Sequence, residues 1–371
     1  ASLNTNAFFG AGTAISEDGT YALIGQPEDY YLSGLGKVFI FERSGFNWVN
    51  KGTIVPDDLS VSDTFGFQIS MSSDAQHAVI SSQYKVVSGL EQAGAVYYFK
   101  RSGDTWVQTQ KIISPENEAY AVFGSGLAIS GDSNHLLIGA EYKDVNASTI
   151  AGKVYYYTRS GDTWAYVGSI TQPSGPVEPW RFGGGIALNY TGDYAMIGGV
   201  YTSLTGYAAG AVNVFNRAGS NWVGTGLIHC PDKNSESNGF GLGIALSRDI
   251  KFAVISAPVV DGYKRDQGAV YLYERNPITY KWVFVRRLSS GEGRIGRSVS
   301  MSGNGSHILI SENRNAFRGE GAGAFHYFSM GREEDLTPVA DDDFRYRSTV
   351  LPDNGNALDM FGIKTTIHPS G

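Results

Sequence analysis

The sequence predicts an all-β fold assembled from repeated units of four antiparallel strands. Three markers carry this prediction, and each recurs at intervals of about 58 residues. A Phe-Gly pair opens the unit, a glycine followed two residues later by Val or Phe starts its third strand, and a tryptophan follows the last hairpin turn. A four-stranded repeat of this length is typical of a β-propeller blade.

The marker positions run through the chain in register. The opening aromatic residues are Phe9, Phe65, Phe123, Phe182, Phe240 and Phe361, with Ile295 in the remaining unit. The glycines that start the third strand are Gly36, Gly94, Gly152, Gly210, Gly268 and Gly323. The tryptophans are Trp48, Trp106, Trp164, Trp222 and Trp282. Three independent markers with one period make chance similarity a poor explanation.

Each element of the unit follows from its residues, as residues 123–170 show. The first strand alternates large and small side chains, so both of its faces are expected to be buried between neighbouring sheets. Gly131 and Asp132 suit the tight turn that leads into a second strand at 136–139. The third strand, 152–157, is rich in aromatic and β-branched residues.

We therefore expect one β-propeller domain over residues 1–371. Its repeat units are about 9–64, 65–122, 123–181, 182–239, 240–294 and 295–360, with a partial unit at 361–371. Six full units plus the opening strand of another favour seven blades, and a six-bladed ring is the alternative. An unclosed ring would expose a strand edge, so closure by residues beyond 371 or by a partner chain is expected.

Composition narrows the classes of partner. The net charge of −7 provides no basic footprint for nucleic acid, and no run of 18 apolar residues is present for membrane insertion. Cys230 is the only cysteine, which excludes an internal disulfide. The chain begins at Ala1 without a methionine, which suggests a processed piece of a longer precursor.

The Phe-Gly opening and the third-strand element resemble the FG-GAP repeat, the blade of integrin α-subunit propellers. The Ser-Gly-Asp-Thr-Trp hairpin at 160–164 looks more similar to the FG-GAP arrays of microbial, algal and viral surface proteins. Integrin-like repeats often carry Asp-x-Asp-x-Asp-Gly calcium loops. The corresponding turns here, such as 16–19 and 72–75, are too short and too poor in carboxylates to bind calcium, so we expect no metal and no cofactor.

A search for catalytic motifs finds little. Residues 291–296 match G-x-G-x-x-G, but the motif leads into a strand and does not open a helix. No G-x-S-x-G elbow, H-E-x-x-H motif or cysteine pair occurs. We therefore predict no catalytic residues and expect that the protein is not an enzyme.

Recognition is expected in the loops between strands two and three and in the loops between blades, which are the least repetitive segments. Trp180 ranks first, because it is the only tryptophan outside the repeat pattern. The other candidates for partner binding are Arg181, Tyr30, Tyr31, Tyr84, Tyr142, Tyr201, Tyr263 and Phe317. Three N-x-S/T sequons mark candidate glycosylation sites at Asn146, Asn189 and Asn304.

These observations favour a non-enzymatic structural or adhesive module that mediates protein-protein or surface interactions. We expect it to be secreted or displayed on an extracellular surface, including that of a virion or filament. Its partners would be another protein or further copies of itself, with a glycan as an alternative. Two other functions stay open at this stage: a carbohydrate-binding lectin, and an accessory propeller of a larger enzyme whose catalytic domain is absent from this sequence.

Overall fold

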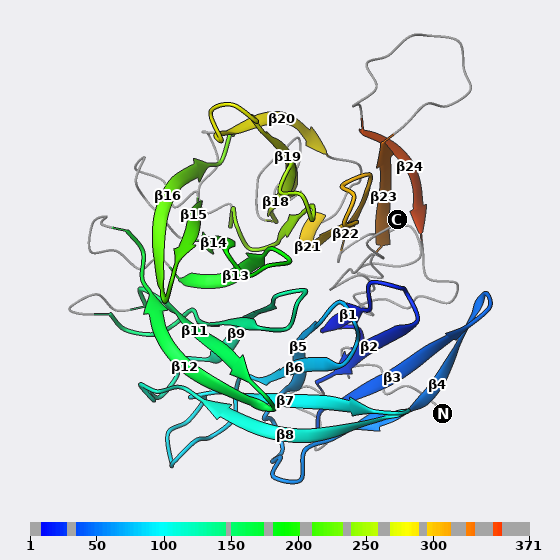
Figure 1. Ribbon diagram of the computed structural model, residues 1–371, viewed down its shortest axis with the longest axis vertical. Coiled ribbons are helices and arrows are strands. Elements are labelled where there is room, and N and C mark those ends of the chain that lie inside the picture. Colours follow the sequence, from blue (N-terminus) through cyan, green and yellow to red (C-terminus); the bar gives the residue numbers. More distant parts are fainter. Residues whose placement is uncertain are drawn as a thin grey trace. The chain divides into compact units, whose positions relative to one another are not determined.

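The computed structural model describes residues 9–27, 35–145, 150–173, 181–200, 210–232, 239–258, 268–288, 295–312, 324–330 and 344–350. The chain divides into two compact units, residues 1–242 and 243–371. The described residues form six antiparallel sheets of four strands each, and in every sheet the strands lie in chain order (Figure 1). We call these sheets blades 1 to 6. The prediction of an all-β propeller with four-stranded antiparallel blades is confirmed.

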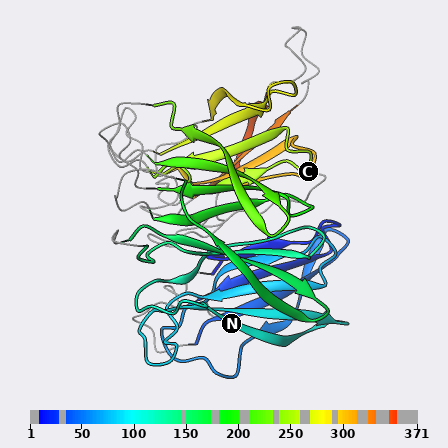
Figure 2. The ribbon, with the colours of Figure 1, turned by 60° about the vertical axis from the view of Figure 1, so that its left-hand side comes forward.

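The first unit holds blades 1 to 4. Blade 1 comprises β1 (Thr13–Ile15), β2 (Tyr21–Gln26), β3 (Lys37–Ser44) and β4 (Asn47–Ile54). Blade 2 comprises β5 (Phe65–Met71), β6 (His77–Ser82), β7 (Ala95–Ser102) and β8 (Thr105–Ile113). Blade 3 comprises β9 (Phe123–Ile129), β10 (His135–Ala140), β11 (Lys153–Ser160) and β12 (Thr163–Ile170). Blade 4 comprises β13 (Phe182–Leu188), β14 (Tyr194–Gly199), β15 (Ala211–Ala218) and β16 (Asn221–His229). Figure 2 shows these strands from a second direction.

The second unit holds the other two described blades. Blade 5 comprises β17 (Ile244–Leu246), β18 (Phe252–Ala257), β19 (Ala269–Arg275) and β20 (Trp282–Leu288). Blade 6 comprises β21 (Ile295–Met301), β22 (His307–Glu312), β23 (Ala324–Met330) and β24 (Phe344–Val350). The favoured count of seven blades is not confirmed, since six are present among the described residues. The partial unit at 361–371 lies outside them.

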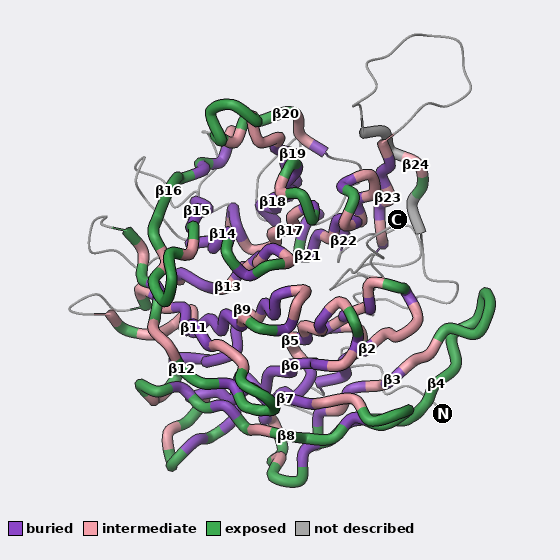
Figure 3. Tube along the Cα trace, in the orientation of Figure 1, coloured by how far each residue is buried: buried purple, intermediate pink, exposed green. Residues whose placement is uncertain are grey.

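Within each unit, the hydrophobic core lies between successive blades. One buried cluster joins blades 1 and 2 and includes Leu23, Ile54, Phe65 and Tyr97. The next joins blades 2 and 3 and includes Phe123. Every residue of the second strands β6, β14 and β18 is buried, whereas the fourth strands β4, β8 and β16 are mostly exposed (Figure 3). This burial explains why both faces of the early strands are apolar.

The repeated glycines stand where the backbones of neighbouring blades meet. A Cβ atom on Gly139 would lie 2.0 Å from the carbonyl oxygen of Gly183 in the next blade. Gly94 has a φ of +84°, and a Cβ atom there would lie 2.2 Å from the carbonyl oxygen of Phe123. Glycine is therefore required by contact between blades as well as by the turns. No helix able to cross a membrane is found in the described part of the chain.

Candidate functional site

The turns between the first two strands use their polar side chains internally. The hydroxyl of Ser72 donates to Asp74 Oδ1 at 2.6 Å, and the backbone N–H of Gln76 donates to the same oxygen at 2.9 Å. Blade 3 repeats this arrangement with Ser130 and Asp132. Each carboxylate thus stabilises its own turn. Across the described residues, no three metal-ligating side chains come together.

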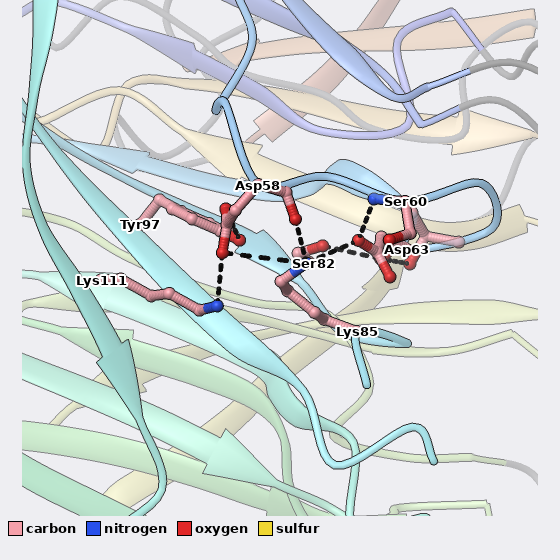
Figure 4. Close-up of polar contacts among 8 residues, drawn as sticks. Asp58, Ser60, Asp63, Ser82, Lys85, Tyr97 and Lys111 are labelled. Atoms are coloured by element: carbon pink, nitrogen blue, oxygen red, sulfur yellow. Dashed lines mark hydrogen bonds and ion pairs between the residues drawn. The ribbon is translucent and has the colours of Figure 1, made fainter. Parts of the chain in front are cut away.

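A lysine-centred network fastens the loop before blade 2 to that blade (Figure 4). We call it the Lys85 network, with Lys85, Asp58, Asp63, Tyr97 and Lys111 as members. Lys85 Nζ donates to Asp63 Oδ2 at 2.8 Å, and these two side chains are only 6% and 5% exposed. The same ammonium donates to the carbonyl oxygen of Asp58 at 2.5 Å.

Asp58 connects the remaining members of the Lys85 network. Its carboxylate accepts hydrogen bonds from the Tyr97 hydroxyl at 2.7 Å and from Lys111 Nζ at 2.5 Å. Burial by itself would raise the pKa of Asp58, but these two hydrogen bonds and the nearby Lys85 charge lower it. Burial, followed by the hydrogen bond to Asp58, raises the pKa of Tyr97. The donors of the Lys85 network bond to acceptors of the same network, so the network is best suited to holding the loop in place.

Blade 3 carries a related but more open arrangement. Lys143, one repeat after Lys85, forms an ion pair with Glu118 in the loop before the blade. The other oxygen of Glu118 accepts the backbone N–H of Asp144 at 3.1 Å. Lys153 forms a second ion pair, at 2.6 Å, with Glu116 of the same loop. The carboxylates of this loop therefore bind both the loop that follows β10 and the first residue of β11.

A carboxylate and a guanidinium meet beside these ion pairs. Glu141 follows β10 directly, and Arg181 directly precedes β13 of the next blade. Arg181 Nη2 lies 3.1 Å from Glu141 Oε2, with the side chains 23% and 14% exposed. The guanidinium carbon also lies 4.4 Å from the centre of the Tyr142 ring. We call Glu141, Tyr142 and Arg181 the rim site.

The backbone holds the rim site in place on both sides. The N–H of Glu141 donates to Ser125 Oγ at 3.0 Å, and the N–H of Arg181 donates to the carbonyl oxygen of Ile150 at 3.1 Å. Gly184 lies against the carboxylate, because a Cβ atom at that position would be 2.8 Å from Glu141 Oε2. The first strand of blade 4 can therefore approach the carboxylate closely.

The rim site has the groups needed for acid-base chemistry at a carbonyl. A carboxylate can accept a proton from water, and a guanidinium can stabilise an oxyanion that develops beside it. The cation over an aromatic face fixes the orientation of the guanidinium. None of these roles needs a group other than the three side chains.

The structure brings two of the residues predicted for partner binding together. Tyr142 and Arg181 are both members of the rim site, and Tyr84 occupies the position equivalent to Tyr142 in blade 2, where it is exposed. The other predicted binding residues lie outside the described residues: Trp180, Tyr30, Tyr31, Tyr201, Tyr263 and Phe317.

The three candidate glycosylation sites differ in their surroundings. The Asn189 side chain is buried, and its carbonyl oxygen accepts the backbone N–H groups of Asp193 and Tyr194. Asn304 is exposed, and its carbonyl oxygen accepts the backbone N–H of Ser306 at 3.0 Å. Asn146 lies outside the described residues. The amide of Asn189 is thus engaged in its own turn.

Sequence analysis missed Glu141, the acidic member of the rim site, and the neighbouring pair of Glu118 with Lys143. One signal was available. Lys85 and Lys143 stand at the same position of successive repeats, and each directly follows a tyrosine. A shared lysine in otherwise variable loops indicates a partner of opposite charge in the preceding loop.

Comparisons with known proteins support the fold. A family model described as the FG-GAP repeat matches residues 106–157, which confirms the resemblance seen in the sequence. A search of curated proteins finds no match. Similar solved structures include a periplasmic gluconolactonase from Pseudomonas aeruginosa. It has a TM-score of 0.63 and 14% identity, and the match covers 96% of this chain and 88% of that one.

Two further matches are candidate 6-phosphogluconolactonases from Bacteroides species. The protein from Bacteroides fragilis has a TM-score of 0.61 and 12% identity, with 96% of this chain and 86% of that chain covered. The protein from Bacteroides uniformis has the same TM-score and identity, with 93% and 86% covered. At such identities the likeness establishes a shared fold.

These matches contradict the expected function. The named structures that share this architecture are lactonases, which are enzymes, so the expectation of a non-enzymatic structural or adhesive module is corrected. The lectin and accessory-propeller alternatives formed part of the same expectation and are not carried forward. The expectation was drawn from contiguous motif spacings, which do not identify side chains such as Glu141 and Arg181 that come from two different blades and meet only in the folded chain.

Proposed function

We propose that this β-propeller with an FG-GAP repeat is a hydrolase that opens a sugar lactone. The observation that carries the proposal is the ion pair between Glu141 and Arg181, half-buried beside the first strand of blade 4. The lactonase names of the solved structures with the same architecture suggest the substrate class.

The proposed reaction uses each member of the rim site. Water adds to the carbonyl carbon of the lactone while the Glu141 carboxylate accepts one of its protons. The carbonyl oxygen becomes an oxyanion, which the Arg181 guanidinium stabilises. The intermediate then collapses, the bond from the carbonyl carbon to the ring oxygen breaks, and that oxygen takes the proton from Glu141. The product is the open-chain hydroxy acid.

Replacing the carboxylate tests this proposal. Glucono-1,5-lactone is supplied, acid release is followed with a pH indicator, and the spontaneous hydrolysis rate is subtracted. We expect Glu141→Gln to lower kcat/KM by about 10²-fold or more, the usual contribution of a general base.

Glu91→Gln is the matched control, because it neutralises another carboxylate of the loops. The Glu91 carboxylate accepts a hydrogen bond from the Tyr120 hydroxyl at 2.8 Å. It should keep activity within about twofold of the parent, as expected for a surface change away from the reacting groups. Hydrolysis by the parent protein at the spontaneous rate would overturn the proposal.

Three earlier expectations also stay proposals. A location outside the cytoplasm is supported by the periplasmic enzyme among the similar structures, and display on a virion or filament surface is its narrower form. A seventh blade is supported by the Phe361-Gly362 pair. Binding of a protein partner, another copy or a glycan is supported by the irregular loops between the regular strands.

A further inference from the structure

We infer that the rim site takes an uncharged sugar lactone in preference to one that carries a phosphate. This inference rests on the proposed function and narrows it, because the similar structures are named for both kinds of substrate. It follows from the charges around the site.

Among the described residues beside the rim site, Arg181, Lys143 and Lys153 each pair with a carboxylate. Arg181 pairs with Glu141 at 3.1 Å. Lys153 pairs with both oxygens of Glu116, at 2.6 and 2.9 Å, and Lys143 pairs with Glu118. Asp144, whose carboxylate accepts the N–H of Ile150, adds a further negative charge. Among the described residues of this surface, four carboxylates thus accompany three cations, which gives this described part a negative charge.

A phosphate monoester brings a charge of about −1.5 to −2 at neutral pH. To bind it, a lysine or arginine would have to leave its present carboxylate. Lys143 and Lys153 are only 12% and 14% exposed, so this exchange would take a largely buried ammonium away from its present carboxylate partner. A neutral sugar lactone requires no such exchange, since its hydroxyls can donate to the same carboxylates.

The test compares two substrates on the intact protein. Glucono-1,5-lactone and its 6-phosphate are assayed at equal concentration, with spontaneous hydrolysis subtracted for each. We expect kcat/KM for the neutral lactone to exceed that for the phosphate by about tenfold or more, the effect of one unfavourable charge contact of modest size. A preference for the phosphate would overturn this inference and leave the proposed hydrolase function standing. Hydrolysis of neither lactone would overturn the proposed function itself.

A charge-neutralising variant tests whether the charges around the rim site cause the preference for the neutral lactone. Glu116→Gln releases Lys153 from its ion pair, so it should raise the phosphate-to-neutral ratio of kcat/KM several-fold, roughly threefold to tenfold. Asp162→Asn is the matched control, because it neutralises the partner of Lys100, 2.7 Å away, at the hairpin turn of blade 3. Its ratio should equal that of the parent. Equal ratios in the two variants would overturn the electrostatic account.

Discussion

At the scale of single residues, three histidines occupy one repeat position, and each stacks on a tyrosine of the following strand. The pairs are His77 with Tyr98, His135 with Tyr156 and His307 with Tyr327, with distances from Nδ1 to the hydroxyl of 2.7, 2.8 and 2.6 Å. Burial lowers the pKa of each histidine. The charges of Arg159 and Arg217 in the following blades lower the pKa of His77 and His135 further.

These shifts predict that the protein loses stability in mild acid. A histidine whose pKa is lowered by folding binds protons more readily in the unfolded chain, so its contribution is fully present above the unfolded pKa of about 6.5. That contribution falls as the pH drops from there toward the lowered pKa of the folded state. Urea unfolding at a series of pH values should show this loss.

The double variant His77→Phe with His135→Phe checks the source of the acid sensitivity. Phenylalanine fills this position in blade 5, as Phe252, where Leu272 stands at the position of the partner tyrosine. The variant should show a shallower fall of unfolding free energy between about pH 6.5 and 5 than the parent. A slope equal to that of the parent would show that other groups cause the acid sensitivity.

The sequence shows that these histidines share one repeat position, but it does not show their contacts. The same limit applies to Arg101, which pairs with Trp106 across β7 and β8, a register that would favour stacking of the guanidinium on the indole. Instead, the Arg101 guanidinium carbon lies 4.2 Å from the ring centre of Tyr21 in the preceding blade. Spacing along one chain fixes the register of a hairpin, but the face on which the next blade packs depends on tertiary structure.

At the scale of elements, the Lys85 network joins the loop before blade 2 to the loop after β6. Replacing Lys85 with methionine keeps most of the side-chain volume and leaves Asp63 buried without the ammonium. Removing one partner of a buried ion pair typically costs about 3 to 5 kcal/mol. We therefore expect Lys85→Met to lower the unfolding free energy by about that amount in urea denaturation.

Two comparisons isolate the ion pair from general effects of losing a lysine. Lys100→Met breaks the exposed pair with Asp162 and should change stability by less than about 1 kcal/mol. Adding Asp63→Asn to Lys85→Met should recover part of the loss, because the unpaired charge is then removed. If the loss of unfolding free energy in the double variant equals the sum of the losses in the two single variants, the ion pair contributes nothing of its own.

The strands were predictable because the residue pattern of each strand matches its burial between neighbouring blades. The predicted second strand at 136–139 lies within β10, and the predicted third strand at 152–157 begins one residue before β11. The rim site was predicted in part. Tyr142 and Arg181 were among the residues predicted for partner binding, whereas Glu141 was not. Its role depends on a neighbouring blade that no local pattern identifies.

At the scale of the whole molecule, the core of the first unit is a series of interfaces between blades. Phe123 of blade 3 is fully buried in a cluster that also contains Val79, Val96 and Tyr98 of blade 2. Each blade of such a repeat protein depends on its neighbours, and stability is close to a sum over units and interfaces. A defect at one interface should therefore loosen both blades that meet there.

Phe123→Ala tests this organisation. The truncation should lower the unfolding free energy by about 3 to 5 kcal/mol, the usual cost of emptying a buried phenylalanine site. Native-state hydrogen exchange followed by mass spectrometry should then rise in peptides from β6 and β7 as well as from β9 to β11, and change least in β18 and β19 of the second unit. Val107→Ala, at a 54% exposed position on β8, should leave all of these peptides unchanged. Increased exchange confined to blade 3 would mean that each sheet is stabilised within itself, and the interface model would then be wrong.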